Sequence, residues 1–327
     1  MAKNPPSGAD KLLFNRLKQF DEPGLFHDNY QTPDYVQANL KDALRPYQHG
    51  ALRYLHYTQR KQDEAQLHYR HLLFHMATGA GKTMVMAGTI LYLFKEYGYQ
   101  NFIFFVHTDA IIQKTRENLL NPQSSKYLFS QVLEIDGEKI TIEPVETFPS
   151  VSERNTIYLK LSTIHKMHDE LNSYRENSIT YEDLKEIPLV LLGDEAHHFN
   201  AGTKAKSKAK TSTEYEELTW ERTIENILEL RPDNRLFEFT ATIDLANKEI
   251  GQKYRDKVVY QYDLKQFMSD GYSKKVMLLE ANQNDNDKML DAVLLSLYRK
   301  LTALDNGITG FKPVILFKSN KIAISKA

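Results

Sequence analysis

The sequence predicts an α/β fold in which a mostly parallel sheet is flanked by helices, and three observations indicate it. Short apolar runs alternate along the chain with longer segments of helical periodicity, as in consecutive βα units. The apolar run at residues 71–76 (HLLFHM) leads through a short glycine-containing loop into a helix-like segment at 84–95. A later run, residues 187–193 (IPLVLLG), is apolar throughout, which is typical of a strand buried on both faces of a parallel sheet.

The bulk composition is ordinary for a globular protein. Of the 327 residues, 41% are hydrophobic and 26% are charged, and the length predicts two domains. The 42 Lys and Arg residues against 43 Asp and Glu residues give a net charge of −1, so nucleic-acid binding would have to depend on local placement of charge. No apolar run approaches the roughly 20 residues that span a bilayer, the first ten residues lack the apolar core of a signal peptide, and there is no cysteine. We therefore expect a cytoplasmic protein with no membrane partner, no disulfide and no thiolate-bound metal.

The loop at residues 76–83 (MATGAGKT) predicts a phosphate-binding site. Gly79 and Gly81 let the backbone turn its N–H groups toward an anion, and the following helix adds the positive end of its dipole. In such a loop Lys82 reaches the β- and γ-phosphates, and the Thr83 hydroxyl binds Mg²⁺. The expected nucleotide-binding residues of the loop are Thr78, Gly79, Ala80, Gly81, Lys82 and Thr83. Met76 departs from the general pattern, which has glycine at that position.

A second motif, Asp194 and Glu195, follows the apolar run at 187–193. The carboxyl ends of parallel strands are where α/β sheets place their ligand sites. Asp194 suits Mg²⁺, directly or through a water, and Glu195 suits the polarisation of an attacking water. An acidic pair in this position is often only a solvated strand end, but a phosphate loop earlier in the chain favours the catalytic interpretation. The two motifs together predict a nucleotide triphosphatase whose catalytic residues include Lys82, Asp194 and Glu195.

Three motifs in this order resemble those of superfamily 2 helicases and translocases with a DEAH box: MATGAGKT at 76–83, DEAHHF at 194–199 and FTAT at 239–242. From about Leu44 onward the chain is most similar to the Res subunit of type III restriction enzymes, in which Met at the head of the loop is common. The resemblance implies a RecA-like P-loop domain and a DNA-dependent ATPase of restriction type that uses ATP and Mg²⁺. It also implies duplex DNA as a partner, with a Mod-type DNA methyltransferase subunit as a second one.

The resemblance assigns roles to residues outside the two main motifs. Gln48 stands where the family has a glutamine that reads the adenine edge, with Arg45 and Tyr47 as candidates for framing the base; a plain amphipathic helix is the alternative. His197, Thr240 and Thr242 match positions that couple hydrolysis to movement, and the two threonines would hydrogen-bond to the DEAH segment. Candidate contacts to the nucleic-acid backbone are Thr108, Lys114 and Thr163. A solvated helix face explains Lys114 equally well, and a helix cap explains Thr163.

The remaining segments were assigned from their periodicity and turn residues. Further strands are predicted at residues 101–107, 155–161, 234–239, 258–262 and 312–318, and residues 275–280 are expected to be the connection that follows the first lobe. Further helices are predicted at residues 11–20, 44–57, 108–120, 220–230, 264–269 and 289–304. We expect an insertion or a β-hairpin within 121–153 and a lysine-studded mobile loop at 200–213, for which a DNA-backbone role is an alternative.

The expected organisation is a helical lead-in at residues 1–43, an ATP-binding domain at 44–282 and the start of a second RecA-like lobe at 283–327. The resemblance implies that the second lobe supplies an arginine finger, so we expect the chain to be truncated, with little hydrolysis and no DNA cleavage of its own. Apolar surface in residues 283–327 is expected to be left uncovered. The alternatives are a repair or remodelling helicase without a nuclease and a truncated regulatory nucleotide-binding module. A P-loop kinase is disfavoured by the Thr-Ala-Thr that follows the DEAH segment.

Overall fold

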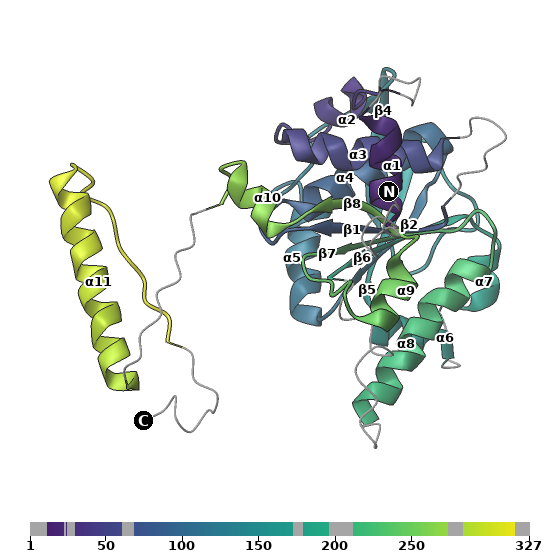
Figure 1. The fold of residues 1–327 in the computed structure, drawn as a ribbon. Helices are drawn as coiled ribbons and strands as arrows, with labels where there is room; N and C mark the ends of the chain where they lie inside the picture. Colours follow the sequence, from purple (N-terminus) through teal and green to yellow (C-terminus); the bar gives the residue numbers. More distant parts are fainter. Residues whose placement is uncertain are drawn as a thin grey trace, which may run out of the picture. The chain divides into compact units, whose positions relative to one another are not determined.

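The computed structural model describes residues 12–22, 24, 30–60, 69–172, 179–195, 212–273 and 284–317. The chain forms two units, Met1–Ser273 and Lys274–Ala327, and each is described by itself (Figure 1). Across the described ranges, every helix is too short or too polar to cross a membrane.

An eight-stranded sheet organises the first unit, in the order β3-β4-β5-β2-β6-β7-β1-β8. Its strands are β1 (His71–Met76), β2 (Asn101–Val106), β3 (Leu133–Ile135), β4 (Glu138–Pro144), β5 (Thr156–Thr163), β6 (Leu189–Asp194), β7 (Arg235–Thr240) and β8 (Val258–Tyr262). Neighbouring strands are parallel except for the β3–β4 pair, which is antiparallel. The predicted α/β fold with a mostly parallel sheet is confirmed.

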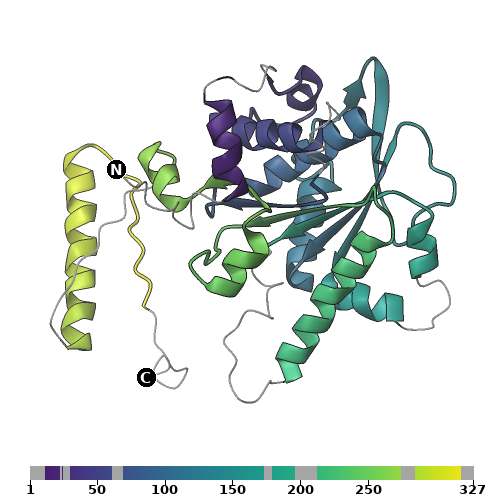
Figure 2. The same cartoon turned by 45° about the vertical axis from the view of Figure 1, so that its right-hand side comes forward.

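Helices cover both faces of the sheet, with α1 to α4 on one side and α6, α8 and α9 on the other (Figures 1 and 2). The helices of the first unit are α1 (Leu13–Asp21), α2 (Asp34–Ala38), α3 (Pro46–Gln59), α4 (Lys82–Tyr97), α5 (Asp109–Leu119), α6 (Ile164–Asn172), α7 (Tyr181–Lys185), α8 (Ser212–Glu229), α9 (Lys248–Tyr254) and α10 (Leu264–Ser269). Side chains alternate across each strand, so every central strand feeds two separate cores. On β1, Leu72 and Phe74 lie in the core under α3 and α4, whereas Leu73 lies in the core under α8 and α9. Burial on both faces is why these strands are apolar throughout.

The segment between α5 and β5 contains a β-hairpin. Of the two expected alternatives for this segment, an insertion or a β-hairpin, the structure has the hairpin. Residues of β3 and β4 pair in antiparallel register, and β4 then pairs with β5 to extend the sheet. The buried Asn39 joins this hairpin to the lead-in: its Nδ2 donates to Glu134 O at 2.8 Å and its Oδ1 accepts from Glu134 N at 2.8 Å. The lead-in is therefore packed on the sheet through the hairpin.

Several predicted boundaries differ from the structure. Helix α8 begins at Ser212, eight residues before the predicted start at Trp220, so the end of the predicted mobile loop is wrong. Residues 213–218 (TEYEEL) include three glutamates and a leucine, which are good helix formers and continue the helix toward its N-terminus. The expected connection at 275–280 lies outside the described residues.

The second unit contains α11 (Asp285–Asp305), a helix of 21 residues with no buried side chain. Several of its apolar residues, among them Leu290 and Leu294, are more than half exposed, as was expected for this part of the chain. A strand was predicted at 312–318. This prediction is wrong for residues 312–317, which form neither helix nor strand, and residue 318 lies outside the described residues. A strand needs a neighbour that accepts and donates its backbone hydrogen bonds, and the described part of this unit offers none.

A buried carboxylate–histidine contact lies within the sheet beneath α9. The Glu238 carboxylate on β7 is 4% exposed and contacts the His71 imidazole on the neighbouring strand β1, and Tyr254 Oη donates to Glu238 at 3.4 Å. Burial alone would raise the pKa of Glu238, but His71, together with Lys253 and Lys257, outweighs it and holds the pKa below its usual range. The carboxylate is therefore charged at neutral pH and stabilises the fold.

We predict that Glu238→Ala destabilises the protein by about 3–5 kcal/mol, because it removes a buried carboxylate that contacts His71 and faces the charges of Lys253 and Lys257. Because the folded-state pKa of Glu238 is depressed, its contribution is complete at neutral pH and is lost as the pH falls below about 4.3. Urea unfolding at pH 7 measures the difference. Glu143→Ala, at an exposed position of β4, is the control and should change stability by less than about 0.5 kcal/mol. Equal effects of the two substitutions would contradict the buried carboxylate–histidine contact.

Candidate nucleotide-binding site

The phosphate loop connects the carboxyl end of β1 to the first residue of α4. Gly79 and Gly81 both have positive φ angles, 80° and 74°, in the region that favours glycine. Helix α4 begins at Lys82, which is 8% exposed, with Gly81 at its N-cap position. Thr78 and Gly79 are exposed at the loop, and Ala80 is buried. The loop thus presents backbone N–H groups at the positive end of a 16-residue helix, an arrangement suited to an anion.

Helix α3 holds this loop through Gln48 and Tyr47. Gln48 Nε2 donates to Ala80 O at 3.0 Å and to Gly81 O at 3.4 Å, while its Oε1 accepts from Arg45 N at 2.8 Å. Tyr47 Oη also donates to Ala80 O, at 3.0 Å. A Cβ atom on Gly81 would lie only 2.5 Å from Gln48 Nε2, so the loop and the glutamine are in tight contact. Gln48 is therefore a structural partner of the loop, and its contact with an adenine base stays a prediction.

Strand β6 brings the acidic pair to the same edge of the sheet. Asp194 is its last residue, and Glu195 follows with a φ of 57°, which is strained for a residue with a Cβ. Lys82 Nζ lies 3.5 Å from Glu195 Oε1, so the structure brings the loop lysine and the acidic pair together, and their catalytic roles stay predictions. Burial raises the pKa of Asp194, and the neighbouring Glu195 charge adds to this rise. The positive charges of Lys82 and Lys114 act in the opposite direction, which places Lys114 near this site.

Strand β7 lies between β6 and β1 and carries the Thr-Ala-Thr segment. Asp194 is paired with Phe239, so the next residue, Thr240, lies level with the acidic pair. Thr240 Oγ1 donates to Thr242 O at 3.0 Å and accepts from Thr242 N at 3.2 Å. These bonds fix the turn after β7. The hydrogen bonds that were expected from both threonines to the DEAH segment stay a prediction, and His197 lies outside the described residues.

The candidate nucleic-acid residues lie at the carboxyl ends of β2 and β5, on the same edge of the sheet. Thr108 and Lys114 are exposed, at the start of α5 and within it. Thr108 occupies the N-cap position, but its side chain makes no capping hydrogen bond. Thr163 Oγ1 accepts from Lys166 N at 3.2 Å, so the helix-cap alternative is observed for this residue. Contacts of these three side chains with DNA stay predictions.

Sequence reasoning missed His75, which connects the loop strand to the Thr-Ala-Thr segment. It pairs with Thr240 on one side and Gln261 on the other, and its Nε2 donates to Ala241 O at 3.2 Å. Burial lowers the pKa of His75, with Lys82 adding to the effect, so the ring is neutral at pH 7. Its Nδ1 is buried and has no hydrogen-bond partner among the described residues. The sequence signal is weak, because a histidine inside an apolar run is usually only a core residue.

The donor set fits a magnesium–nucleotide complex. A loop with two positive-φ glycines leaves room for phosphate oxygens, and Lys82 supplies a positive charge beside it. The Thr83 hydroxyl and the Asp194 carboxylate are the oxygen ligands that Mg²⁺ prefers. Thr83 is the second residue of α4, and Asp194 ends β6.

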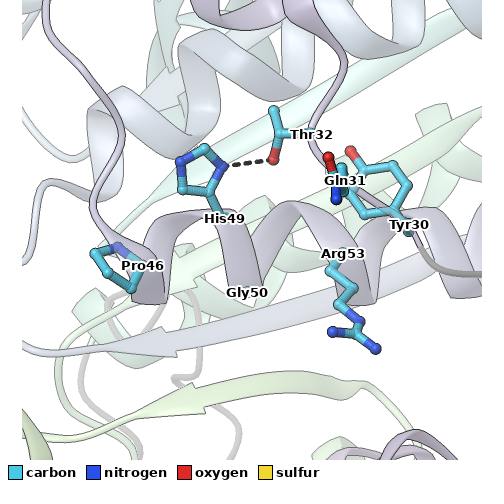
Figure 3. A pocket seen from close by; sticks show the side chains of 7 residues that line it. All are labelled: Tyr30, Gln31, Thr32, Pro46, His49, Gly50 and Arg53. Atoms are coloured by element: carbon cyan, nitrogen blue, oxygen red, sulfur yellow. Dashed lines mark hydrogen bonds between the residues drawn. The ribbon is translucent and has the colours of Figure 1, made fainter. Parts of the chain in front are cut away.

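A separate cavity of about 410 Å³ lies between α3 and residues 30–32 (Figure 3). Its helical wall is formed by Pro46, His49, Gly50 and Arg53, on a different face of α3 from Gln48. His49 Nδ1 is 2.7 Å from Thr32 Oγ1, and the Arg53 guanidinium pairs with Asp21. Two polar side chains of the lining are thus paired with each other, and the guanidinium is paired with a carboxylate outside the lining.

Comparisons with known proteins agree on one family. The family model described as "Type III restriction enzyme, res subunit" matches residues 41–245, which is more than half of the chain. A probable type III restriction-modification enzyme HindVIP Res subunit of Haemophilus influenzae is 38% identical over 343 aligned residues, covering 97% of this chain and 66% of that protein. Among solved structures, the UvsW helicase from bacteriophage T4 has a TM-score of 0.40 at 11% identity, over 77% of this chain and 78% of that one. A nuclease-deletion mutant of the Type ISP restriction-modification enzyme LlaGI has a TM-score of 0.41 at 12% identity, over 82% of this chain and 23% of that one. Both structural resemblances are distant.

We predict that Gly81→Ala weakens nucleotide binding by about tenfold or more, because the methyl group meets Gln48 and the positive φ costs about 1–2 kcal/mol. Equilibrium titration of the purified chain with Mg²⁺-ATP measures the effect. Gly98→Ala is a matched control, since Gly98 also has a positive φ, of 72°, but a Cβ there would meet nothing within 4 Å. Gly98→Ala is therefore expected to carry only the strain and to leave binding unchanged. Normal binding by Gly81→Ala would contradict the contact between the loop and Gln48.

Proposed function

The chain belongs to the family of type III restriction enzyme Res subunits, and we propose that it is the ATP-binding and ATP-hydrolysing motor lobe of a DNA translocase. The observation that carries this proposal is the ion pair of 3.5 Å between Lys82 Nζ and Glu195 Oε1. It joins a loop suited to phosphates with a carboxylate suited to polarising water, and hydrolysis of a terminal phosphate needs both.

In this proposal each residue of the site has a defined task. The backbone N–H groups of residues 78–83 and the Lys82 ammonium bind the phosphates. Thr83 and Asp194 would hold Mg²⁺, which would supply positive charge to offset that of the phosphate oxygens. Glu195 orients the attacking water and accepts its proton. Lys82 exchanges its Glu195 partner for phosphate oxygens when the nucleotide binds, and this releases the carboxylate for the water.

The coupling and DNA contacts are further parts of the proposal. Thr240, Thr242 and His197 would transmit hydrolysis to movement, and β7 supports this because it lies directly between the loop strand and the acidic strand. Thr108, Lys114 and Thr163 would contact the backbone of duplex DNA. The position of Thr108 and Thr163 at the carboxyl ends of β2 and β5 supports this role, and Lys114 is exposed on α5, which follows β2.

The chain spans 66% of the length of the curated relative that it matches. Translocation, restriction and a Mod-type methyltransferase partner are accordingly proposals for the whole protein, as are a cytoplasmic location and the division at residues 43/44 and 282/283. A repair or remodelling helicase without a nuclease would use the same site. A regulatory nucleotide-binding module is a weaker candidate, because the strained Glu195 beside Lys82 has a use in hydrolysis and none in binding alone.

We predict opposite behaviour for substitutions of the two paired residues. Lys82→Ala should weaken Mg²⁺-ATP binding by about 10- to 100-fold, because a charge-assisted contact with phosphate is lost. Glu195→Gln should bind ATP as well as the unsubstituted chain or more tightly, since the carboxylate no longer competes for Lys82. Its turnover in the presence of duplex DNA should fall by about 10²- to 10⁴-fold.

Titration calorimetry gives the affinities, and phosphate release with duplex DNA, single-stranded DNA or RNA gives turnover. Lys139→Ala and Glu143→Gln, at exposed positions of β4, are the matched controls for loss of charge. Undiminished ATP binding by Lys82→Ala would overturn the phosphate-loop assignment. Full turnover by Glu195→Gln would instead overturn only the catalytic role of that carboxylate.

A further inference from the structure

An aromatic cluster packs against the phosphate loop beside Gln48. Tyr47 stacks on Tyr262 with ring centroids 4.1 Å apart, and Phe267 meets both rings edge-on at 6.1 Å. Tyr272 completes the cluster, stacked over Phe267 at 6.0 Å and edge-on to Tyr47 at 5.2 Å. Tyr47, Tyr262 and Phe267 are buried, whereas Tyr272 is 38% exposed. Tyr272 therefore packs against aromatic rings on one side and faces solvent on the other.

The exposed side of this cluster carries Arg45. Its guanidinium carbon lies 4.8 Å from the centre of the Tyr272 ring, and its Nη1 donates to Tyr47 Oη at 3.2 Å. Arg45 itself is exposed, and among the described residues no second ring or carboxylate contacts its guanidinium. A guanidinium that is held on one face by an aromatic ring still has its other planar face available for stacking.

The position of this face relative to the loop indicates what it can bind. The Arg45 backbone N–H is bound to Gln48, and Gln48 and Tyr47 both donate to the Ala80 carbonyl in the loop. A nucleotide whose phosphates lie on the loop would therefore have its base beside this aromatic cluster. The base is an aromatic heterocycle, the kind of group that stacks on a guanidinium plane.

We propose that Tyr272 is a positioning residue for the nucleotide base: its ring holds the Arg45 guanidinium so that the outer face of the guanidinium stacks on the base. This inference rests on the proposed nucleotide-binding function of the loop. Tyr272 does not itself touch the base. It fixes an otherwise flexible arginine side chain before the nucleotide arrives, which lowers the entropy that binding would lose.

The test separates the base from the phosphates by comparing Mg²⁺-ATP with Mg²⁺-tripolyphosphate, which has no base. Tyr272→Ala should weaken ATP binding about fivefold, the size of a partly exposed cation–π contact, and leave tripolyphosphate binding unchanged. Tyr272→Phe keeps the ring and should bind ATP normally. Tyr181→Ala, a partly buried tyrosine on α7, is the control and should bind both ligands normally.

A double-mutant cycle tests whether Tyr272 acts through Arg45. Arg45→Ala should weaken ATP binding at least as much as Tyr272→Ala does, and adding Tyr272→Ala to Arg45→Ala should cause no further loss. Unchanged ATP affinity in Tyr272→Ala overturns the proposal. Parallel losses for ATP and tripolyphosphate also overturn it, because the substitution would then be acting on the loop. If the unsubstituted chain binds neither ligand, the proposed function itself fails, and this result is distinct from the others.

Discussion

The parallel pairing of β7 with both β1 and β6 is the constraint on which the rest of the site depends. Neighbouring strands lie about 4.8 Å apart, so the loop strand and the acidic strand are about two spacings from each other. The registers place His75 beside Thr240 and Asp194 beside Phe239, so all three strands end at the same level. Across that gap the long Lys82 side chain reaches Glu195. A different strand order would separate the phosphate loop from its carboxylates.

The second support of the site comes from before β1 in the chain. Helix α3 donates two hydrogen bonds to the single carbonyl of Ala80, from Tyr47 and from Gln48. The loop is therefore held by hydrogen bonds from α3 and by its direct continuation from β1. Gln48 also lies in tight contact with Gly81. Because a loop with positive-φ glycines has few contacts of its own, this clamp determines whether its N–H groups stay in place for phosphate.

Much of the fold and the centre of the site could be predicted from the sequence, because their signals are local. The predicted strand at 258–262 and the predicted glycine-containing loop are both found in the structure. Both predictions depend only on residues that are close together in the sequence. Residues 312–317 carried the same apolar signal and form no strand, because a strand also requires a partner that no local pattern specifies. The order of the strands in the sheet is likewise not specified by any local sequence pattern. It brings His75 to Ala241, which lies 166 residues further along the chain.

The contacts that could not be predicted are also those that connect the two halves of the proposed nucleotide site. The phosphate half is built from the loop, α4 and β6. The proposed base half is built from Arg45, Tyr47 and Tyr272. The hydrogen bond from Tyr47 Oη to the Ala80 carbonyl of the loop joins the two halves. A displacement of Tyr47 would thus disturb both halves, whereas the contact of Tyr272 with the Arg45 guanidinium belongs to the base half. Tyr272 is also the residue directly before Ser273, where the first unit ends. The residue proposed to position the base therefore contacts Arg45 directly and the phosphate loop only indirectly, through the rings of Tyr47 and Phe267.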